Sequence, residues 1–101
     1  MIIAQFIKTP CRRLFFSSRG HARVEKGEIN RICAAASMLS FTLVAALEEE
    51  NLQLQAQQRE GELVVITADS PLARNCLRVI NSGYRLLAQH YPQQVQVLEE
   101  I

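Results

Sequence analysis

Cysteine and histidine are scarce in this sequence, and their placement argues against two kinds of small domain. The three cysteines are Cys11, Cys33 and Cys76. A small, odd number of cysteines does not indicate a disulfide framework, and such sparse use of cysteine suits a reducing compartment. The sequence has no Cys-x-x-Cys pair, and its two histidines, His21 and His90, lie far apart, so no set of zinc ligands is apparent. We therefore expect a cytoplasmic protein without a bound metal or cofactor.

A long hydrophobic run is also missing. The longest stretch without a charged residue, 32–47, has sixteen residues and includes serine and threonine, whereas a helix needs about 20 apolar residues to span a bilayer. Near the amino terminus the positive charges follow a short apolar segment, which reverses their order in a secretory signal peptide. These features predict no membrane association, and residues 32–47 are expected in a buried helix.

The chain carries no strong excess of charge. A formal net charge of +1 over 101 residues predicts no bulk attraction to nucleic acid. The charges are nevertheless uneven, because residues 1–31 have a net charge of +5 and residues 32–101 a net charge of −4. A basic segment such as 8–31 is most simply a solvated edge of the molecule. Alternatively it faces an anionic partner, in which case a weak contact with nucleic acid is expected.

Apolar residues are abundant, at 49% of the sequence, which is sufficient for a folded core. A chain of 101 residues corresponds to one domain of ordinary size. No internal repeat, linker or low-complexity segment interrupts it. We therefore treat residues 1–101 as a single domain.

Alternating apolar and polar residues predict five strands. They cover residues 2–8, 11–18, 51–57, 62–68 and 94–99. Thr9-Pro10 supplies a turn between the first two strands, and Arg59-Glu60-Gly61 supplies one between the next two. Each of these two pairs is therefore expected to form a hairpin, with the third strand half-buried.

Apolar residues spaced three and four apart predict two helices. The first begins after Asn30, a suitable N-cap, and ends near Asn51. Its apolar face is expected to comprise Ile32, Ala36, Leu39, Leu43 and Leu47. The second has Pro71 at its first position, after Asp69 or Ser70 as the cap. Its apolar stripe is expected to comprise Leu72, Cys76, Val79 or Ile80, and Leu87.

The predicted element order is ββαββαβ. Because hairpins pair strands antiparallel, this order favours an α+β fold with two layers. We expect a largely antiparallel sheet of about five strands, with both helices packed on one face.

The stretch from Gly20 to Ser37 holds a histidine and a cysteine that could act together. If Asn30 caps the helix, Cys33 lies in its first turn, where free N–H groups and the helix dipole favour a thiolate. A thiolate becomes an effective nucleophile when a histidine base lies within about 3 Å. The loop between His21 and Cys33 can close at little cost. Ser37 follows Cys33 by one turn and could donate a hydrogen bond to an oxyanion.

Each of these residues also has a simpler interpretation. Cysteine is among the most buried residue types, so Cys33 could merely pack in the core. His21 could be an ordinary surface histidine, and Ser37 could bond back to the preceding helical turn. Spacing alone does not decide between chemistry and packing.

The motif GHA at residues 20–22, followed by CAAAS at residues 33–37, resembles the signature of the ribosomal-processing cysteine protease Prp family. The similarity extends over essentially the whole chain. It implies a cysteine-protease-like domain in which His21 is the base and Cys33 the nucleophile of a catalytic dyad. Gly20 and Ser37 fall on matching positions of the motif.

The family resemblance further implies a substrate and an assembly. Members of this family remove a short N-terminal extension from a bacterial large-subunit ribosomal protein, the twenty-seventh, and so expose its mature end for ribosome assembly. Members of the family resemble one another in being small cytoplasmic homodimers, so the resemblance implies a homodimer here. The resemblance therefore implies a cysteine endopeptidase whose partner is the N-terminal segment of a ribosomal protein precursor.

Asn30 departs from the family pattern, which has an aspartate three residues before the cysteine. If that carboxylate stabilises a charged imidazolium, asparagine does so less well. If the residue caps the helix or orients the histidine, asparagine can do both. We therefore expect Asn30 to act as a supporting residue beside Gly20 and Ser37.

Two other functions compete with the endopeptidase. One is a non-catalytic, ribosome-associated binding module that uses the basic segment 8–31. The other is a structural subunit whose exposed sheet edges drive dimerisation.

Overall fold

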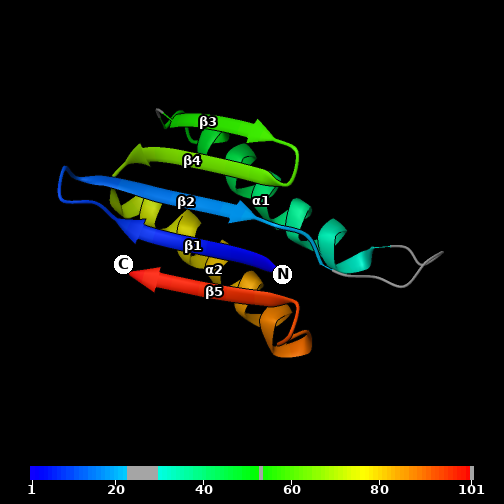
Figure 1. Ribbon diagram of the computed structural model, residues 1–101. Helices are drawn as coiled ribbons and strands as arrows, with labels where there is room; N and C mark the ends of the chain where they lie inside the picture. The colour runs from blue at the N-terminus through cyan, green and yellow to red at the C-terminus, as the bar shows by residue number, and fades with distance from the viewer. Residues whose placement is uncertain (23–29, 53, 101) are drawn as a thin grey trace.

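The computed structural model describes residues 1–22, 30–52 and 54–100, and within them the chain forms five strands and two helices (Figure 1). In chain order they are β1 (Ile2–Lys8), β2 (Arg13–Arg19), α1 (Arg31–Glu49), β3 (Leu54–Arg59), β4 (Glu62–Ala68), α2 (Pro71–His90) and β5 (Val95–Glu100). This order confirms the predicted ββαββαβ arrangement.

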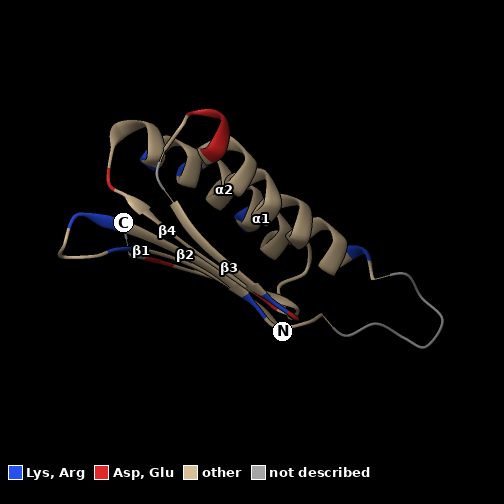
Figure 2. Ribbon diagram, turned by 90° about the horizontal axis from the view of Figure 1, so that it is seen from above, with Lys and Arg blue, Asp and Glu red and all other residues tan. Residues whose placement is uncertain are grey.

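The strands form one sheet in the order β3-β4-β2-β1-β5. The pairs β3–β4, β4–β2 and β2–β1 are antiparallel, and the pair β1–β5 is parallel. The parallel pair arises because α2 carries the chain back along the sheet before β5 begins. Both helices lie on the same face of the sheet (Figure 2). The predicted two-layer, largely antiparallel α+β fold is therefore confirmed.

Two strands begin two or more residues later than the sequence predicts, because a residue before each adopts a left-handed backbone. Arg12 has a φ of 59°, and β2 starts after it, at Arg13. Asn51 has a φ of 55° at the end of α1, and β3 starts three residues later, at Leu54. β3 is an edge strand and mostly exposed, so the half-buried alternation expected of it is wrong at Ala56.

α1 begins where the N-cap prediction places it. Asn30 Oδ1 accepts a hydrogen bond from the backbone N–H of Cys33 at 2.9 Å. The buried residues of α1 are Ala36, Ser40, Leu43 and Leu47, three of which belong to the predicted face. By length and composition α1 could also cross a membrane, but these side chains are buried within the two-layer domain, with the leucines in its hydrophobic core.

The buried face of α2 differs from the predicted stripe. Its N-cap is Ser70, whose Oγ accepts from the backbone N–H of Ala73 at 3.1 Å. Leu72 is 41% exposed, so its predicted burial is wrong, and of the alternatives Val79 and Ile80 it is Ile80 that is buried, at 4% exposure. The residues that are buried are Ala73, Leu77, Ile80, Asn81 and Tyr84. These also recur at spacings of three and four, so the sequence contains two such stripes and tertiary packing selects this one.

Aromatic rings from both layers meet at the centre of the core. The ring centroids of Phe6 on β1 and Phe16 on β2 are 4.9 Å apart. Tyr84 of α2 lies 6.3 Å from Phe6 and 5.9 Å from Phe16. All three side chains are fully buried, and they hold α2 against the sheet beside α1.

Candidate active site

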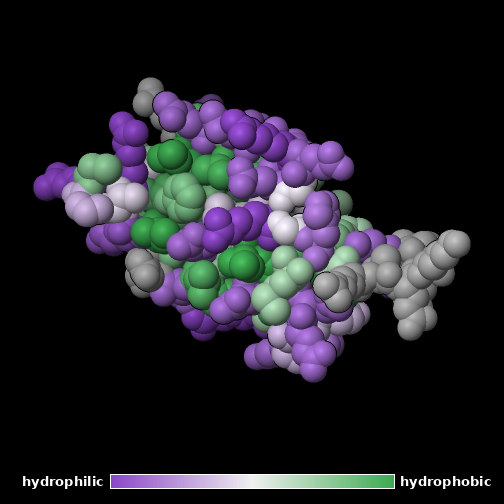
Figure 3. Space-filling view, viewed as in Figure 1, coloured by the Kyte–Doolittle hydropathy of each residue, from purple (hydrophilic) through white to green (hydrophobic). Residues whose placement is uncertain are grey.

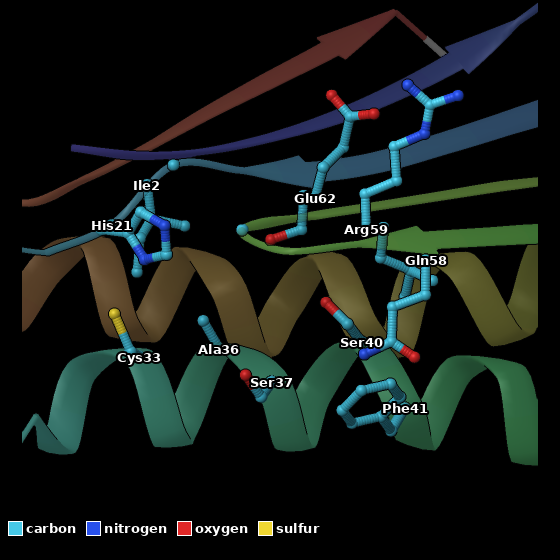
Figure 4. Close-up of a pocket in the computed structure, with 14 residues that line it drawn as sticks. Ile2, His21, Cys33, Ala36, Ser37, Ser40, Phe41, Gln58, Arg59 and Glu62 are labelled. Atoms are coloured by element: carbon cyan, nitrogen blue, oxygen red, sulfur yellow. The ribbon is translucent and has the colours of Figure 1, made fainter.

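A pocket of about 210 Å³ opens between α1 and the turn end of the β3–β4 hairpin (Figure 4). From α1 it is lined by Cys33, Ala36, Ser37, Ser40 and Phe41. From the hairpin it is lined by Gln58, Arg59, Gly61, Glu62 and Leu63. His21 and Cys33 lie together at one end of the pocket. The structure therefore brings the predicted histidine and cysteine into one site.

The backbone just after β2 fixes the position of His21. Gly20 has a φ of 100°, and a Cβ there would lie 2.0 Å from the carbonyl oxygen of Met1, so only glycine fits. The N–H of Gly20 donates to the carbonyl oxygen of Gly61 at 2.9 Å. The amino group of Met1 donates to the carbonyl oxygen of His21 at 2.7 Å. Gly20 is therefore needed for close backbone packing beside the histidine.

Cys33 lies in the first turn of α1 and is half-buried. Its thiol points from α1 toward the His21 ring, which extends from the opposite wall (Figure 4). The backbone N–H of Ala22 lies 3.4 Å from Cys33 Sγ and donates to it. The N-terminal end of α1 and this N–H both direct the positive ends of their dipoles toward the sulfur.

Asn30 connects the two segments that carry the histidine and the cysteine. Its Oδ1 accepts from the N–H of Cys33, as the N-cap requires, and its Nδ2 donates to the carbonyl oxygen of Ala22 at 3.2 Å. Ala22 directly follows His21 and donates in turn to Cys33 Sγ. The side chain of Asn30 therefore holds Ala22 where its N–H can reach the sulfur.

Ser37 lines the pocket one turn after Cys33 and is exposed. Within the part of the chain that the structure describes, its hydroxyl makes no hydrogen bond. By contrast, the N–H of Cys33 is bound by Asn30 Oδ1 and the N–H of Ala34 by the Asn30 carbonyl oxygen at 3.1 Å. Of these three donors, the Ser37 hydroxyl is the one free to bind a group in the pocket.

The other two cysteines lie away from this pocket. Cys11 is exposed in the β1–β2 turn, where its sulfur lies 3.2 Å from Thr9 Oγ1. Cys76 is half-buried on α2, and burial, with a smaller contribution from the charge of Glu50, raises the pKa of its thiol. Cys33 is thus the cysteine that faces both a histidine and a cavity.

Sequence reasoning missed the wall of the pocket formed by the β3–β4 hairpin. Arg59-Glu60-Gly61 was recognisable as a turn, but nothing local indicates that Gly61 lies against His21, forty residues away. Tyr84 was missed as well. Its hydroxyl lies 2.6 Å from Ser40 Oγ and 2.9 Å from Ser18 Oγ, and both serines line the pocket.

The basic segment 8–31 does not gather on one surface in its described part. Lys8, Arg12 and Arg13 lie around the β1–β2 turn, where Lys8 is 3.7 Å from Asp69. Arg19 ends β2 and Arg31 begins α1, and both of these element ends lie away from the β1–β2 turn (Figure 1). Residues 23–29 of this segment lie outside the described residues.

Comparisons with known proteins identify relatives of the chain by sequence and by fold. A family model described as cysteine protease Prp matches residues 1–96, whereas a search of curated proteins found no match. The essential ribosomal processing protease Prp of Staphylococcus aureus, solved with a covalently linked product peptide, is 16% identical with a TM-score of 0.85, and the alignment covers 99% of this chain and 100% of that one. The same protease with a substrate peptide is 14% identical with a TM-score of 0.76, at 99% and 100% coverage.

A third structure, SMU.848 from Streptococcus mutans, is 26% identical with a TM-score of 0.74, and the alignment covers 99% of this chain and 94% of that one. The likeness to the two staphylococcal structures establishes the fold. The match of the family model over residues 1–96, nearly the whole chain, shows that this protein belongs to the cysteine protease Prp family.

Proposed function

We propose that this protein is a cysteine endopeptidase in which Cys33 is the nucleophile and His21 the general base. The observation that carries the proposal is that α1 and the end of β2 direct the thiol and the imidazole toward one another at one end of a pocket. The proposed substrate is the N-terminal extension of the twenty-seventh protein of the bacterial large ribosomal subunit. The staphylococcal relatives, described as ribosomal processing proteases, support this class of substrate.

In the first step His21 takes the proton of the Cys33 thiol, and the sulfur attacks the carbonyl carbon of the scissile peptide bond. The Ala22 N–H, 3.4 Å from Sγ, stabilises the thiolate before attack. The carbonyl oxygen becomes negatively charged as the carbon–sulfur bond forms. The free hydroxyl of Ser37 donates a hydrogen bond to this oxyanion.

In the second step the carbon–nitrogen bond breaks and His21 returns its proton to the leaving amine. The N-terminal extension is then held as a thioester on Cys33. His21 next takes a proton from water, and the resulting attack releases the extension as a free acid and restores the thiol. Because the substrate is a ribosomal protein precursor, we place this reaction in the cytoplasm.

The proposal is tested by incubating the purified protein with the ribosomal protein precursor of the same organism and following intact masses. We expect one cut that removes the extension, and loss of cleavage in Cys33→Ala and in His21→Ala. Cys76→Ala is the matched control, because that thiol is away from the pocket and its raised pKa keeps it protonated. Cleavage that survives Cys33→Ala or His21→Ala would contradict the assignment.

The alternative of a non-catalytic module that binds through residues 8–31 has less support, because the described basic residues divide between two ends of the sheet. Thiol labelling distinguishes the two functions. An activated Cys33 should react with iodoacetamide faster than Cys11, although Cys11 is more exposed. Slower labelling of Cys33 than of Cys11 would favour the binding module.

A further inference from the structure

The imidazole of His21 rests against the turn between β3 and β4. A Cβ built on Gly61 would lie 2.5 Å from His21 Nε2 and 3.0 Å from Cε1, so the edge of the ring occupies the space that any other residue would fill. The carbonyl oxygen of Gly61 also accepts from the N–H of Gly20, the residue before the histidine. The same turn thus contacts both the backbone and the ring of this segment.

No hydrogen bond within the described residues fixes the ring. His21 is exposed, and within residues 1–22, 30–52 and 54–100 its ring nitrogens make no hydrogen bond. An exposed side chain without such a partner samples several rotamers. Contact with the backbone of Gly61 removes part of that freedom on the side facing the hairpin.

We propose that Gly61 is a positioning residue for the reaction, because its missing side chain lets the His21 ring lie where it can exchange a proton with Cys33. This inference rests on the proposed function, and it assigns the β3–β4 turn the role of positioning the general base, His21. Carbon atoms in contact prefer a separation of about 3.5–4.0 Å, so a methyl group at Gly61 would displace the ring by roughly 1 Å.

The displacement should affect catalysis more than folding. The obstructing atoms are at the end of a flexible side chain, so His21 can swing away without moving the sheet. A misplacement of about 1 Å in a reacting group can lower the rate on the order of 100-fold. The hairpin wall, formed by residues such as Gln58 and Arg59, still presents the same pocket to the peptide. We therefore expect kcat to fall while KM stays close to the wild-type value.

Two substitutions distinguish the steric effect of a side chain at Gly61 from the cost of its positive φ. Gly61 has a φ of 71°, which alanine adopts at a cost and asparagine adopts more readily. Gly61→Ala and Gly61→Asn should both lower kcat on the order of 100-fold, since both introduce a Cβ. Gly83→Ala is the matched control, because its Cβ would lie 2.5 Å from Leu39 Cδ2, away from His21, and should leave kcat near wild type.

Two further measurements do not require cleavage. In the wild type, NMR should show a nuclear Overhauser contact between the His21 ring and the Gly61 α-protons, and Gly61→Ala should label Cys33 with iodoacetamide more slowly. If the wild type cleaves no precursor but both results hold, the peptidase proposal fails and the positioning of His21 stands. Unchanged kcat and labelling in Gly61→Ala, or recovery in Gly61→Asn, would overturn the inference.

Discussion

Asn30 makes two hydrogen bonds that an ionised aspartate cannot make together. Its oxygen accepts from the Cys33 N–H, and its nitrogen donates to the Ala22 carbonyl oxygen. A carboxylate could accept the first bond but has no proton for the second. The amide of Asn30 therefore joins the cysteine and histidine segments.

Asn30→Asp should lower activity without unfolding the protein. Aspartate caps a helix as well as asparagine does, so the melting temperature should fall only by the several degrees that loss of one hydrogen bond causes. The bond to Ala22 is lost, and a negative charge is added beside the thiolate. Loss of about 1 kcal/mol of positioning corresponds to roughly fivefold in rate, so kcat/KM should fall by about fivefold or more.

Precursor cleavage and thermal unfolding of Asn30→Asp and Asn30→Ser measure these two effects separately. Serine keeps the cap without either the amide donor or the added charge. If the added negative charge contributes to the loss, Asn30→Ser should retain more activity than Asn30→Asp. An Asn30→Asp variant as active as the wild type would show that the Ala22 bond is dispensable.

The residues of the candidate site divide into those that the sequence predicts and those that it cannot. His21, Cys33 and Asn30 were accessible because a helix N-cap and the motif are local patterns. Gly61 and Tyr84 were not, since each reaches the site through contacts between segments at least forty residues apart. A turn glycine and a buried tyrosine look the same in sequence wherever the fold places them.

Among the secondary-structure elements, α2 is joined to α1 and β2 by one buried hydroxyl group. Tyr84 Oη lies 2.6 Å from Ser40 Oγ on α1, 2.9 Å from Ser18 Oγ on β2 and 2.9 Å from the Ala36 carbonyl oxygen. Burial raises the pKa of Tyr84, so the phenol stays neutral and keeps its proton for these oxygens. This network fixes the part of α1 that lines the pocket.

Tyr84→Phe should destabilise the domain by about 1–3 kcal/mol, because the oxygens of Ser18, Ser40 and Ala36 lose a buried partner. Chemical denaturation measures the loss. Tyr91→Phe is the matched control, since Tyr91 is 41% exposed and should change stability little. Equal stability of the two variants would mean that water replaces the phenol in the network.

The start of α2 carries an ion pair whose effect depends on pH. Asp69 Oδ1 and Oδ2 accept from Arg74 Nε at 2.5 Å and Nη2 at 2.8 Å. Arg74, aided by Lys8, lowers the pKa of Asp69 below its ordinary value of 3.8. A lowered folded-state pKa gives stabilisation that is complete above the ordinary value and disappears as pH falls through the folded-state value.

Asp69→Asn should therefore lower the melting temperature at neutral pH. The difference from wild type should shrink as the pH is brought below the folded-state pKa, where the wild-type carboxyl is protonated too. Calorimetry across this range is the measurement. A difference that persists unchanged in strong acid would mean that geometry, not charge, makes the contribution.

Local sequence patterns predicted where strands and helices lie better than they predicted which strands pair with one another in the sheet. The two hairpins follow from turn residues, and each strand pair joined by a turn was correct. The pairing of β2 with β4 and of β1 with β5 joins segments that are far apart in the chain, and no periodicity encodes it. The same limit explains the choice of stripe on α2, which only packing against the sheet decides.

At the scale of the whole molecule, the described residues cover one face of the sheet with helices and leave the other face bare (Figure 2). Side chains alternate along a strand, so residues next to the buried ones point to the bare face. Several of these are apolar, and they are Ile3, Ile7, Phe15, Val64, Ile66 and Leu98. Figure 3 shows hydrophobic side chains gathered over the middle strands. An apolar patch of this kind in a small domain indicates an interface.

We propose that a second copy of the chain covers this face, because its apolar side chains are otherwise left partly exposed to water. Phe15 is central, because it pairs with Ile7 on β1 and with Ile66 on β4. A charge there would lie on both halves of a symmetric interface, so Phe15→Lys should produce monomers. Sedimentation velocity at micromolar concentration distinguishes the two states. Val79→Lys, on the exposed face of α2, should remain dimeric. A monomeric wild type, or a dimeric Phe15→Lys beside a monomeric Val79→Lys, would assign the bare face another role.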